Sequence, residues 1–133
     1  MAEKVVCAQG KHLILDMYGA SNLTNIEYAT EAFRDAVQAA GATILDINMH
    51  DFKTVNMPSA GFTGVAVLAE SHMSVHTWPE HGYAAFDIFM CGDADIDSAE
   101  RVLMARFSPT SVERQFIERR AVSSIGLLNK EMK

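Results

Sequence analysis

Residues 73–90 contain two β-type segments joined by a short turn sequence. Residues 73–78 alternate between apolar and polar side chains, which is the two-residue period of a β-strand, and residues 83–90 form a second run of strand-forming residues. Between the two segments, Pro79 and Gly82 favour a turn. We therefore predict a β-hairpin, around which the other elements of the chain have to be arranged.

The remaining chain supplies further strands and two helices. β-type runs predict strands at residues 12–18, 43–49, 63–68 and 112–117. Apolar residues at steps of three and four predict helices over residues 23–40 and 96–107. We expect Asn22 or Asn25 to cap the first helix, Gly41 to end it, and Asp95 or Asp97 to begin the second. Residues 51–61 are expected to form a loop, and residues 123–133 a short helix or a mobile tail.

This order of elements predicts the fold class. Two helices separated by several antiparallel strands are typical of an α+β protein, a two-layer sandwich in which both helices cover one face of a mainly antiparallel sheet. The chain of 133 residues fits a single domain that spans residues 1–133. The second face of the sheet is then either solvated or buried, and we expect a homodimer to cover it.

Composition excludes several classes of partner. The formal net charge of −6 argues against nucleic-acid binding, which draws on clustered lysine and arginine side chains. No apolar run is long enough to suggest a membrane span, and residues 1–11 lack the apolar core of a signal peptide. We therefore expect a cytoplasmic protein without a membrane partner, and we expect Cys7 and Cys91 to be thiols.

Three residues near the hairpin could carry chemistry. Ser71 stands between two predicted strands, where its hydroxyl could attack the preceding carbonyl, although most serines in such places are turn residues. His76 could move protons, but in a regular strand it would point away from Ser71, so that a bend would be needed to bring the two together. Cys91 is either a small buried side chain or a thiol that exchanges protons.

Other side chains could bind a ligand. Phe52 and Trp78 are either core residues or flat platforms for a ring, and Glu80 is either a solvated charge or an acceptor for sugar hydroxyls. The histidines and acids match no metal-ligand spacing, so that no metal is predicted. The common glycine-rich nucleotide motifs and the hydrolase serine motif are absent from the sequence.

Several short motifs stand close together in this region of the sequence. They are Glu70-Ser71-His72, His76-Thr77-Trp78-Pro79-Glu80, Gly82-Tyr83-Ala84-Ala85-Phe86-Asp87 and Cys91-Gly92. This set closely resembles the short bacterial and archaeal S-adenosylmethionine decarboxylases, which depend on a pyruvoyl group. The resemblance is strongest over residues 61–92, and it extends more weakly to residues 10–12, 16–19 and 41–43. It implies an α/β sandwich that assembles as a dimer of processed protomers.

The resemblance implies that the chain is a proenzyme. It would cleave itself between Glu70 and Ser71 into chains 1–70 and 71–133, and Ser71 would become the covalent pyruvoyl group. That group forms a Schiff base with the substrate amine, so neither pyridoxal phosphate nor another diffusible cofactor is expected. By the same resemblance, His76 transfers protons during processing and Cys91 protonates the product.

The substrate-binding residues also follow from the resemblance. Phe52 resembles the phenylalanine that stacks on adenine, and Glu80 the acid that binds ribose, while Trp78 favours a nucleoside. The implied activity is decarboxylation of S-adenosylmethionine to the aminopropyl donor for spermidine synthesis. Relatives that keep the same serine, histidine and cysteine can act on arginine or ornithine, and this alternative stays open.

Thr63 departs from the family pattern, in which a serine occupies this position. Threonine keeps a hydroxyl that could hydrogen-bond the processing intermediate, but its extra methyl group restricts its rotamers. The cleavage rate is therefore in question. A second alternative is an unprocessed, non-catalytic homologue that acts as a binding or regulatory partner.

Overall fold

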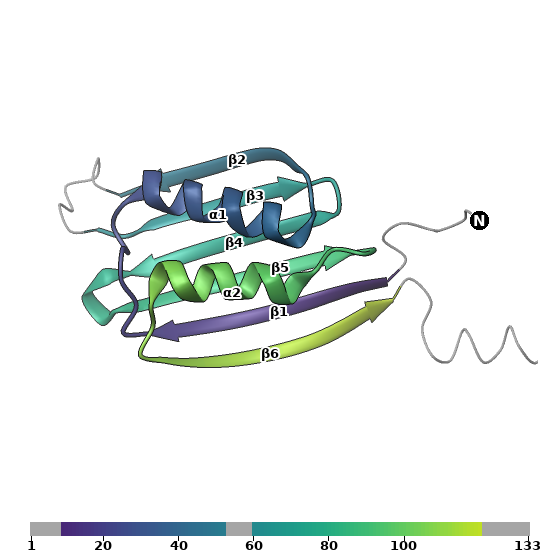
Figure 1. The fold of residues 1–133 in the computed structure, drawn as a ribbon. Helices are drawn as coiled ribbons and strands as arrows, with labels where there is room; N and C mark the ends of the chain where they lie inside the picture. The colour runs from purple at the N-terminus through teal and green to yellow at the C-terminus, as the bar shows by residue number, and fades with distance from the viewer. Residues whose placement is uncertain (1–8, 53–59, 121–133) are drawn as a thin grey trace, which may run out of the picture.

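A computed structural model describes residues 9–52 and 60–120. Its six strands form one sheet in the order β2-β3-β4-β5-β1-β6, in which every neighbouring pair is antiparallel (Figure 1). The strands are β1 (Gln9–Tyr18), β2 (Ile44–Asp51), β3 (Phe62–Leu68), β4 (Ser71–Trp78), β5 (Tyr83–Cys91) and β6 (Ser111–Arg120). The predicted tail, most of the predicted loop and Cys7 lie outside the described residues.

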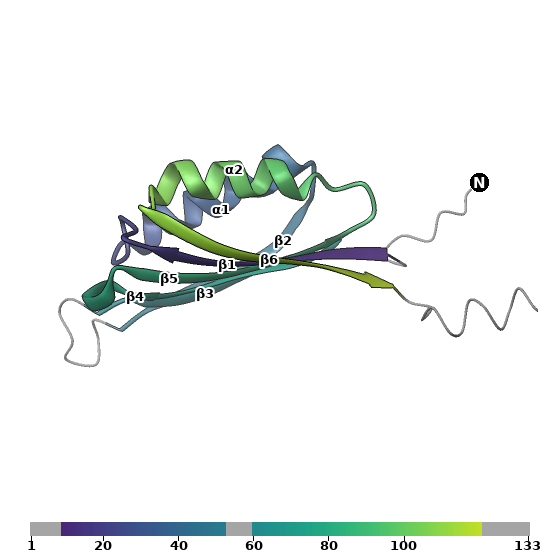
Figure 2. The same cartoon turned by 90° about the horizontal axis from the view of Figure 1, so that it is seen from below.

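The two helices, α1 (Ile26–Ala40) and α2 (Ile96–Phe107), lie on the same face of the sheet (Figure 2). Asn25 caps α1 by accepting a hydrogen bond from a backbone N–H of the first turn, and Asp95 caps α2 in the same way. Gly41 ends α1 in the left-handed region at φ 73°. The predicted α+β sandwich is therefore confirmed.

The hairpin is formed by β4 and β5. One turn of 3₁₀ helix, η2 (Pro79–His81), joins the two strands, and Gly82 follows it at φ 61°. Trp78 then pairs directly with Tyr83. The strands extend beyond their predicted ends. In β1, Gly10 and Lys11 pair with both β5 and β6, and Gln9 pairs with β6. Backbone pairing continues there through polar residues, which an apolar pattern does not reveal.

The core lies between the sheet and the helices. Alternate strand residues point into it, including the fully buried Leu13, Leu15 and Met17 of β1. No described helix covers the opposite side of the sheet, which we call the open face (Figure 2). Val65 and Val67 of β3 are 38% and 42% exposed there. No helix among the described residues is long and apolar enough to cross a membrane.

Candidate active site

The Glu70–Ser71 bond lies in the turn between β3 and β4. Leu68 ends β3 and Ser71 begins β4, so that only two residues separate the strands. The turn is held to the connection between α1 and β2: the backbone N–H of Ala69 donates to the carbonyl of Thr43, and the Thr43 N–H donates to the Glu70 carboxylate at 3.0 Å. The bond is thus presented in a short, anchored turn.

Cys91 lies beside this turn. It ends β5, one residue beyond Met90, which is the pairing partner of Ser71. Its Sγ lies 2.7 Å from the carbonyl oxygen of Glu70. The side chain is buried, with 3% of its surface exposed. The structure therefore brings together Glu70, Ser71 and Cys91, as a shared site requires.

The state of Cys91 differs from the prediction. The structure records its sulfur in a disulfide, whereas the sequence predicts a thiol. The other cysteine in the sequence, Cys7, lies outside the described residues. The prediction relied on the far-apart sequence positions of the cysteines and on the expected reducing compartment, neither of which shows whether Cys91 is oxidised. A proton-donating Cys91 requires the reduced form.

Ser71 and His76 do not lie together in one chain. β4 continues without a break from Ser71 to Trp78, so that the bend required for their meeting is absent from this strand. Five residues of strand span roughly 16 Å. Buried residues alternate through the strand as Met73, Val75 and Thr77, and His76 is exposed on the open face. The two side chains therefore occupy opposite ends and opposite faces of β4.

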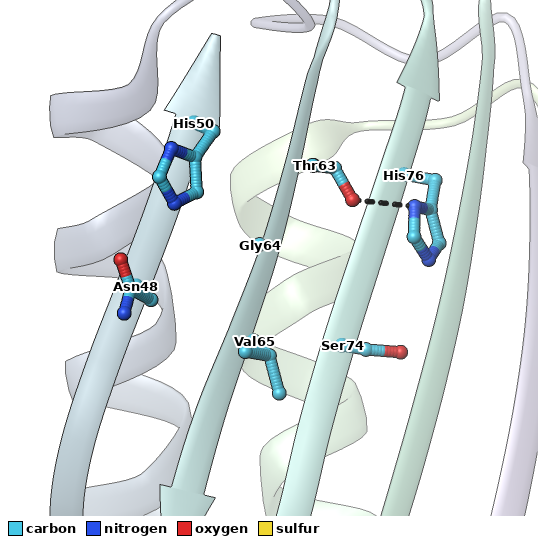
Figure 3. Close-up of a pocket in the computed structure, with 7 residues that line it drawn as sticks. All are labelled: Asn48, His50, Thr63, Gly64, Val65, Ser74 and His76. Carbon is cyan, nitrogen blue, oxygen red and sulfur yellow. Dashed lines mark hydrogen bonds between the residues drawn. The ribbon is translucent and has the colours of Figure 1, made fainter.

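His76 instead contacts Thr63. The two residues pair directly across β3 and β4, and the Thr63 hydroxyl lies 2.6 Å from Nδ1 of His76 (Figure 3). They border a depression of about 320 Å³ on the open face, which is also lined by His50 and Asn48 of β2. Thr63 can thus orient the imidazole of His76, either by donating a hydrogen bond to Nδ1 or by accepting one from it.

The predicted substrate-binding residues gather at the same end of the sheet as Thr63 and His76. Phe52 directly follows the end of β2, where Asp51 pairs with Phe62, and its side chain is 40% exposed. Trp78 ends β4 and is 41% exposed, and Glu80 is exposed in η2. These side chains are available to a ligand.

Sequence patterns missed the aromatic partners of Trp78. Its ring stacks on Tyr83 at a centroid distance of 5.1 Å, and Tyr83 stacks on Tyr18 at 5.5 Å. The Tyr83 hydroxyl donates to the carboxylate of Asp16 at 2.6 Å, and this hydrogen bond is the main cause that raises the pKa of Tyr83 to about 12. Pairing Trp78 with Tyr83 across the predicted turn could have revealed the first contact.

A second group missed by the sequence reading lies on the open face near Ser71. The carboxylate of Asp87 accepts hydrogen bonds from Nε2 of His12 and Nε2 of His72, and from the Ser74 hydroxyl at 3.1 Å. Burial raises the pKa of Asp87, but the hydrogen bond from His12, the nearby His72 and the Ser74 hydroxyl outweigh it, so that the pKa lies below its usual value. We call His12, His72 and Asp87 the histidine–aspartate cluster.

Comparisons with known proteins agree with this architecture. The family model for S-adenosylmethionine decarboxylase matches residues 11–120. An S-adenosylmethionine decarboxylase proenzyme from Thermomicrobium roseum is 40% identical over 111 residues, which cover 83% of this chain and 92% of that protein. One from Methanococcus maripaludis is 48% identical over 86 residues, covering 63% of this chain and 66% of the relative.

A solved structure gives the same result. The crystal structure of the adenosylmethionine decarboxylase from Aquifex aeolicus VF5 superposes with a TM-score of 0.73 at 33% sequence identity. The match covers 88% of this chain and 95% of the solved chain. With the family model extending over most of its length, the chain belongs to the S-adenosylmethionine decarboxylase family.

Proposed function

We propose that this chain cleaves itself between Glu70 and Ser71 and then decarboxylates S-adenosylmethionine, producing the aminopropyl donor for spermidine synthesis. The proximity of Cys91 Sγ to the Glu70 carbonyl oxygen, at 2.7 Å, carries this proposal, because it places beside the bond to be cut a sulfur that becomes a proton donor once it is reduced. The relatives named as S-adenosylmethionine decarboxylase proenzymes support the same activity.

Self-cleavage would begin at the Ser71 hydroxyl. Its oxygen attacks the carbonyl carbon of Glu70, the peptide nitrogen leaves as an amine, and an ester joins the two residues. Loss of the Cα proton of Ser71 then breaks its Cβ–O bond, which releases the Glu70 carboxylate and chain 1–70. Water replaces the nitrogen of the resulting dehydroalanine, ammonia departs, and a pyruvoyl group remains at the start of chain 71–133.

The residues present fit this group. Ser71 is half-buried at the start of a strand, so that a substrate can reach it, and Cys91 Sγ lies beside the carbonyl that precedes it. When formed, the pyruvoyl group supplies a carbonyl that binds the substrate amine and accepts the electrons released with carbon dioxide. In its reduced form, Cys91 then protonates the product carbon.

His76 and Thr63 require a second copy of the chain to reach Ser71. Within one chain, five residues of continuous strand separate Ser71 from His76. A homodimer packed through the two open faces, with its strands running in opposite directions, would set the Thr63–His76 end of one chain beside the turn that holds the Glu70–Ser71 bond of the other. The exposed Val65, Val67 and Trp78 supply apolar surface for such packing.

The activity is tested by measuring carbon dioxide release from S-adenosylmethionine, arginine and ornithine under reducing conditions. We expect release from S-adenosylmethionine, because the exposed Trp78 and Phe52 offer aromatic surface for its adenine. The Ser71→Ala variant is the matched control and should release none. Faster release from arginine or ornithine would show that one of these amino acids is the substrate instead. A stable chain that stays uncut and inactive would favour a binding role.

The arrangement of the dimer is tested by mixing two defective chains. Ser71→Ala cannot be cut but retains His76, whereas His76→Asn retains Ser71. If His76 acts across the dimer, co-expression of the two should lead to cleavage of the His76→Asn chain in mixed dimers. If that chain remains as uncut as when it is expressed alone, the packing through open faces is wrong.

A further inference from the structure

The histidine–aspartate cluster is assembled by three adjacent strands. His72 of β4 and His12 of β1 both pair with Phe89 of β5, so that the two imidazoles stand on either side of the same residue. Asp87 precedes Phe89 by two residues and therefore points to the same open face. Because all three side chains start from paired strands, their relative positions are set by the sheet.

The three ligand atoms converge on one point. Nε2 of His12, Nε2 of His72 and a carboxylate oxygen of Asp87 all lie within 4.8 Å of one another, and the His72–Asp87 contact is 2.9 Å. Around a zinc ion, bonds of about 2.0–2.2 Å at tetrahedral angles hold ligand atoms roughly 3–4 Å apart. Small side-chain rotations would bring the three atoms to that spacing.

We propose that His12, His72 and Asp87 bind a divalent transition-metal ion of the Zn²⁺ class, with the fourth position left for a water molecule. Two imidazoles and one carboxylate suit such an ion, whereas Mg²⁺ and Ca²⁺ prefer oxygen ligands throughout. In the single chain, the His12, Asp87 and His72 side chains are 17%, 30% and 40% exposed, so that an ion can reach them there. Ser74 donates to Asp87 and helps to orient its carboxylate.

The positive charge of Arg119 would weaken binding of a cation at this cluster, so that a substitution of Arg119 tests the proposed metal site. A guanidinium nitrogen of Arg119 lies 3.4 Å from Nδ1 of His12, and the central guanidinium carbon, Cζ, lies 4.9 Å from the centre of the Phe89 ring. When Nε2 of His12 binds a metal, Nδ1 carries the proton and cannot accept from an arginine. Arg119 must then turn away. Arg119→Gln removes one positive charge and offers an amide oxygen that can accept a hydrogen bond from Nδ1–H of His12, so that metal affinity should rise.

The site does not depend on the proposed function. Its ligands belong to the folded sheet and include neither Ser71 nor Cys91, so the uncut Ser71→Ala chain and a Cys91→Ser chain should both bind the ion. The sequence predicted no metal, because His50, His72, Asp46 and Asp87 match no metal-ligand spacing, and His12 was not among the candidates. Only strand pairing brings the three proposed ligands together.

The experiment titrates the full-length chain with Zn²⁺ by calorimetry and with Co²⁺ by visible absorption, and it uses Mg²⁺ as the comparison ion. We expect one Zn²⁺ per chain, visible Co²⁺ bands of a site with nitrogen ligands, and no Mg²⁺ binding that depends on these residues. His72→Gln and Asp87→Asn should each weaken Zn²⁺ binding by about tenfold or more. His81→Gln, at an exposed histidine in η2, is the matched control and should leave binding unchanged.

Two results would overturn the site. The first is the absence of Zn²⁺ binding to a folded wild-type chain. The second is equal affinity in the wild type, His72→Gln and Asp87→Asn. Should a ligand variant fail to fold, Arg119→Gln still decides, because it keeps all three ligands: tighter binding supports the site, and unchanged or weaker binding contradicts it.

Discussion

Sγ of Cys91 lies 2.7 Å from the carbonyl oxygen of Glu70, although the two residues are 21 positions apart in the sequence. The contact joins the end of β5 to the turn that precedes β4. It gives the same sulfur access to the carbonyl that self-cleavage would attack and to the position where the product would be protonated.

Cys91→Ala should permit folding and cleavage but slow decarboxylation. Removing the acid that protonates the product is expected to reduce kcat by about 10²–10⁴-fold, the usual contribution of a positioned acid. The measurement is steady-state carbon dioxide release from a preparation whose cleavage has been checked by mass. Cys91→Ser, which keeps a weaker acid of similar size, is the comparison. Normal kcat in fully cleaved Cys91→Ala would remove Cys91 from turnover.

Thr63→Val should slow self-cleavage, because it keeps the β-branched shape but removes the hydroxyl that contacts His76. Loss of one such polar group is expected to reduce the rate by about 10²–10³-fold. Thr63→Ser is the matched control: it keeps the hydroxyl with freer rotamers, so that its rate should equal or exceed that of the wild type. Cleavage is followed over time by gel electrophoresis. Equal rates in Thr63→Val and the wild type would exclude the hydroxyl from processing.

Thr77→Val should destabilise the fold by about 1–3 kcal/mol, because buried polar groups would lose their partner. The buried Thr77 hydroxyl accepts from the backbone N–H of Phe62 at 2.9 Å and donates to the carbonyl of Leu23 at 2.8 Å. Urea unfolding in the Ser71→Ala background avoids mixtures of cut and uncut chains. Thr77→Ser keeps both hydrogen bonds and should lose less stability than Thr77→Val. The reverse order would contradict the assigned hydrogen bonds.

Tyr83 should ionise near pH 12, where its pKa is raised mainly by the hydrogen bond to Asp16. Because the folded-state pKa lies above the unfolded value of about 10, the neutral phenol adds stability below pH 10. That stability is lost as the pH rises from about 10 to about 12. The difference in phenolate absorbance between the wild type and Tyr83→Phe isolates this residue. Asp16→Asn should lower the pKa, and an unchanged value would show that Asp16 is not its cause.

Local patterns predicted the elements of the fold well. The alternation of β4, the helical period of α1 and the glycines at positions 41 and 82 all act over a few residues, and the structure agrees with each. Strand order could not be predicted in the same way. β1 lies between β5 and β6 in the sheet. Pairing between segments that are distant in the sequence does not change the local residue pattern of either strand, so that the pattern does not predict it.

The candidate site was only partly predictable for the same reason. The motifs identified Ser71, His76 and Cys91, and the two-residue period correctly opposed Ser71 to His76 on a regular strand. The contact of Thr63 with His76 and the convergence of His12 and His72 on Asp87 depend on register between strands. Sequence separation conceals such contacts, because backbone pairing aligns residues that lie 13 to 75 positions apart.

The most direct test of the central claim is the intact mass of the purified protein under denaturing conditions. Self-cleavage predicts two species, chain 1–70 ending in Glu70 and chain 71–133 whose first residue has lost its amine and carries a pyruvoyl group. Ser71→Ala should give a single uncut chain. A wild-type protein that stays one species with the mass of the full chain after long incubation under reducing conditions would contradict the account.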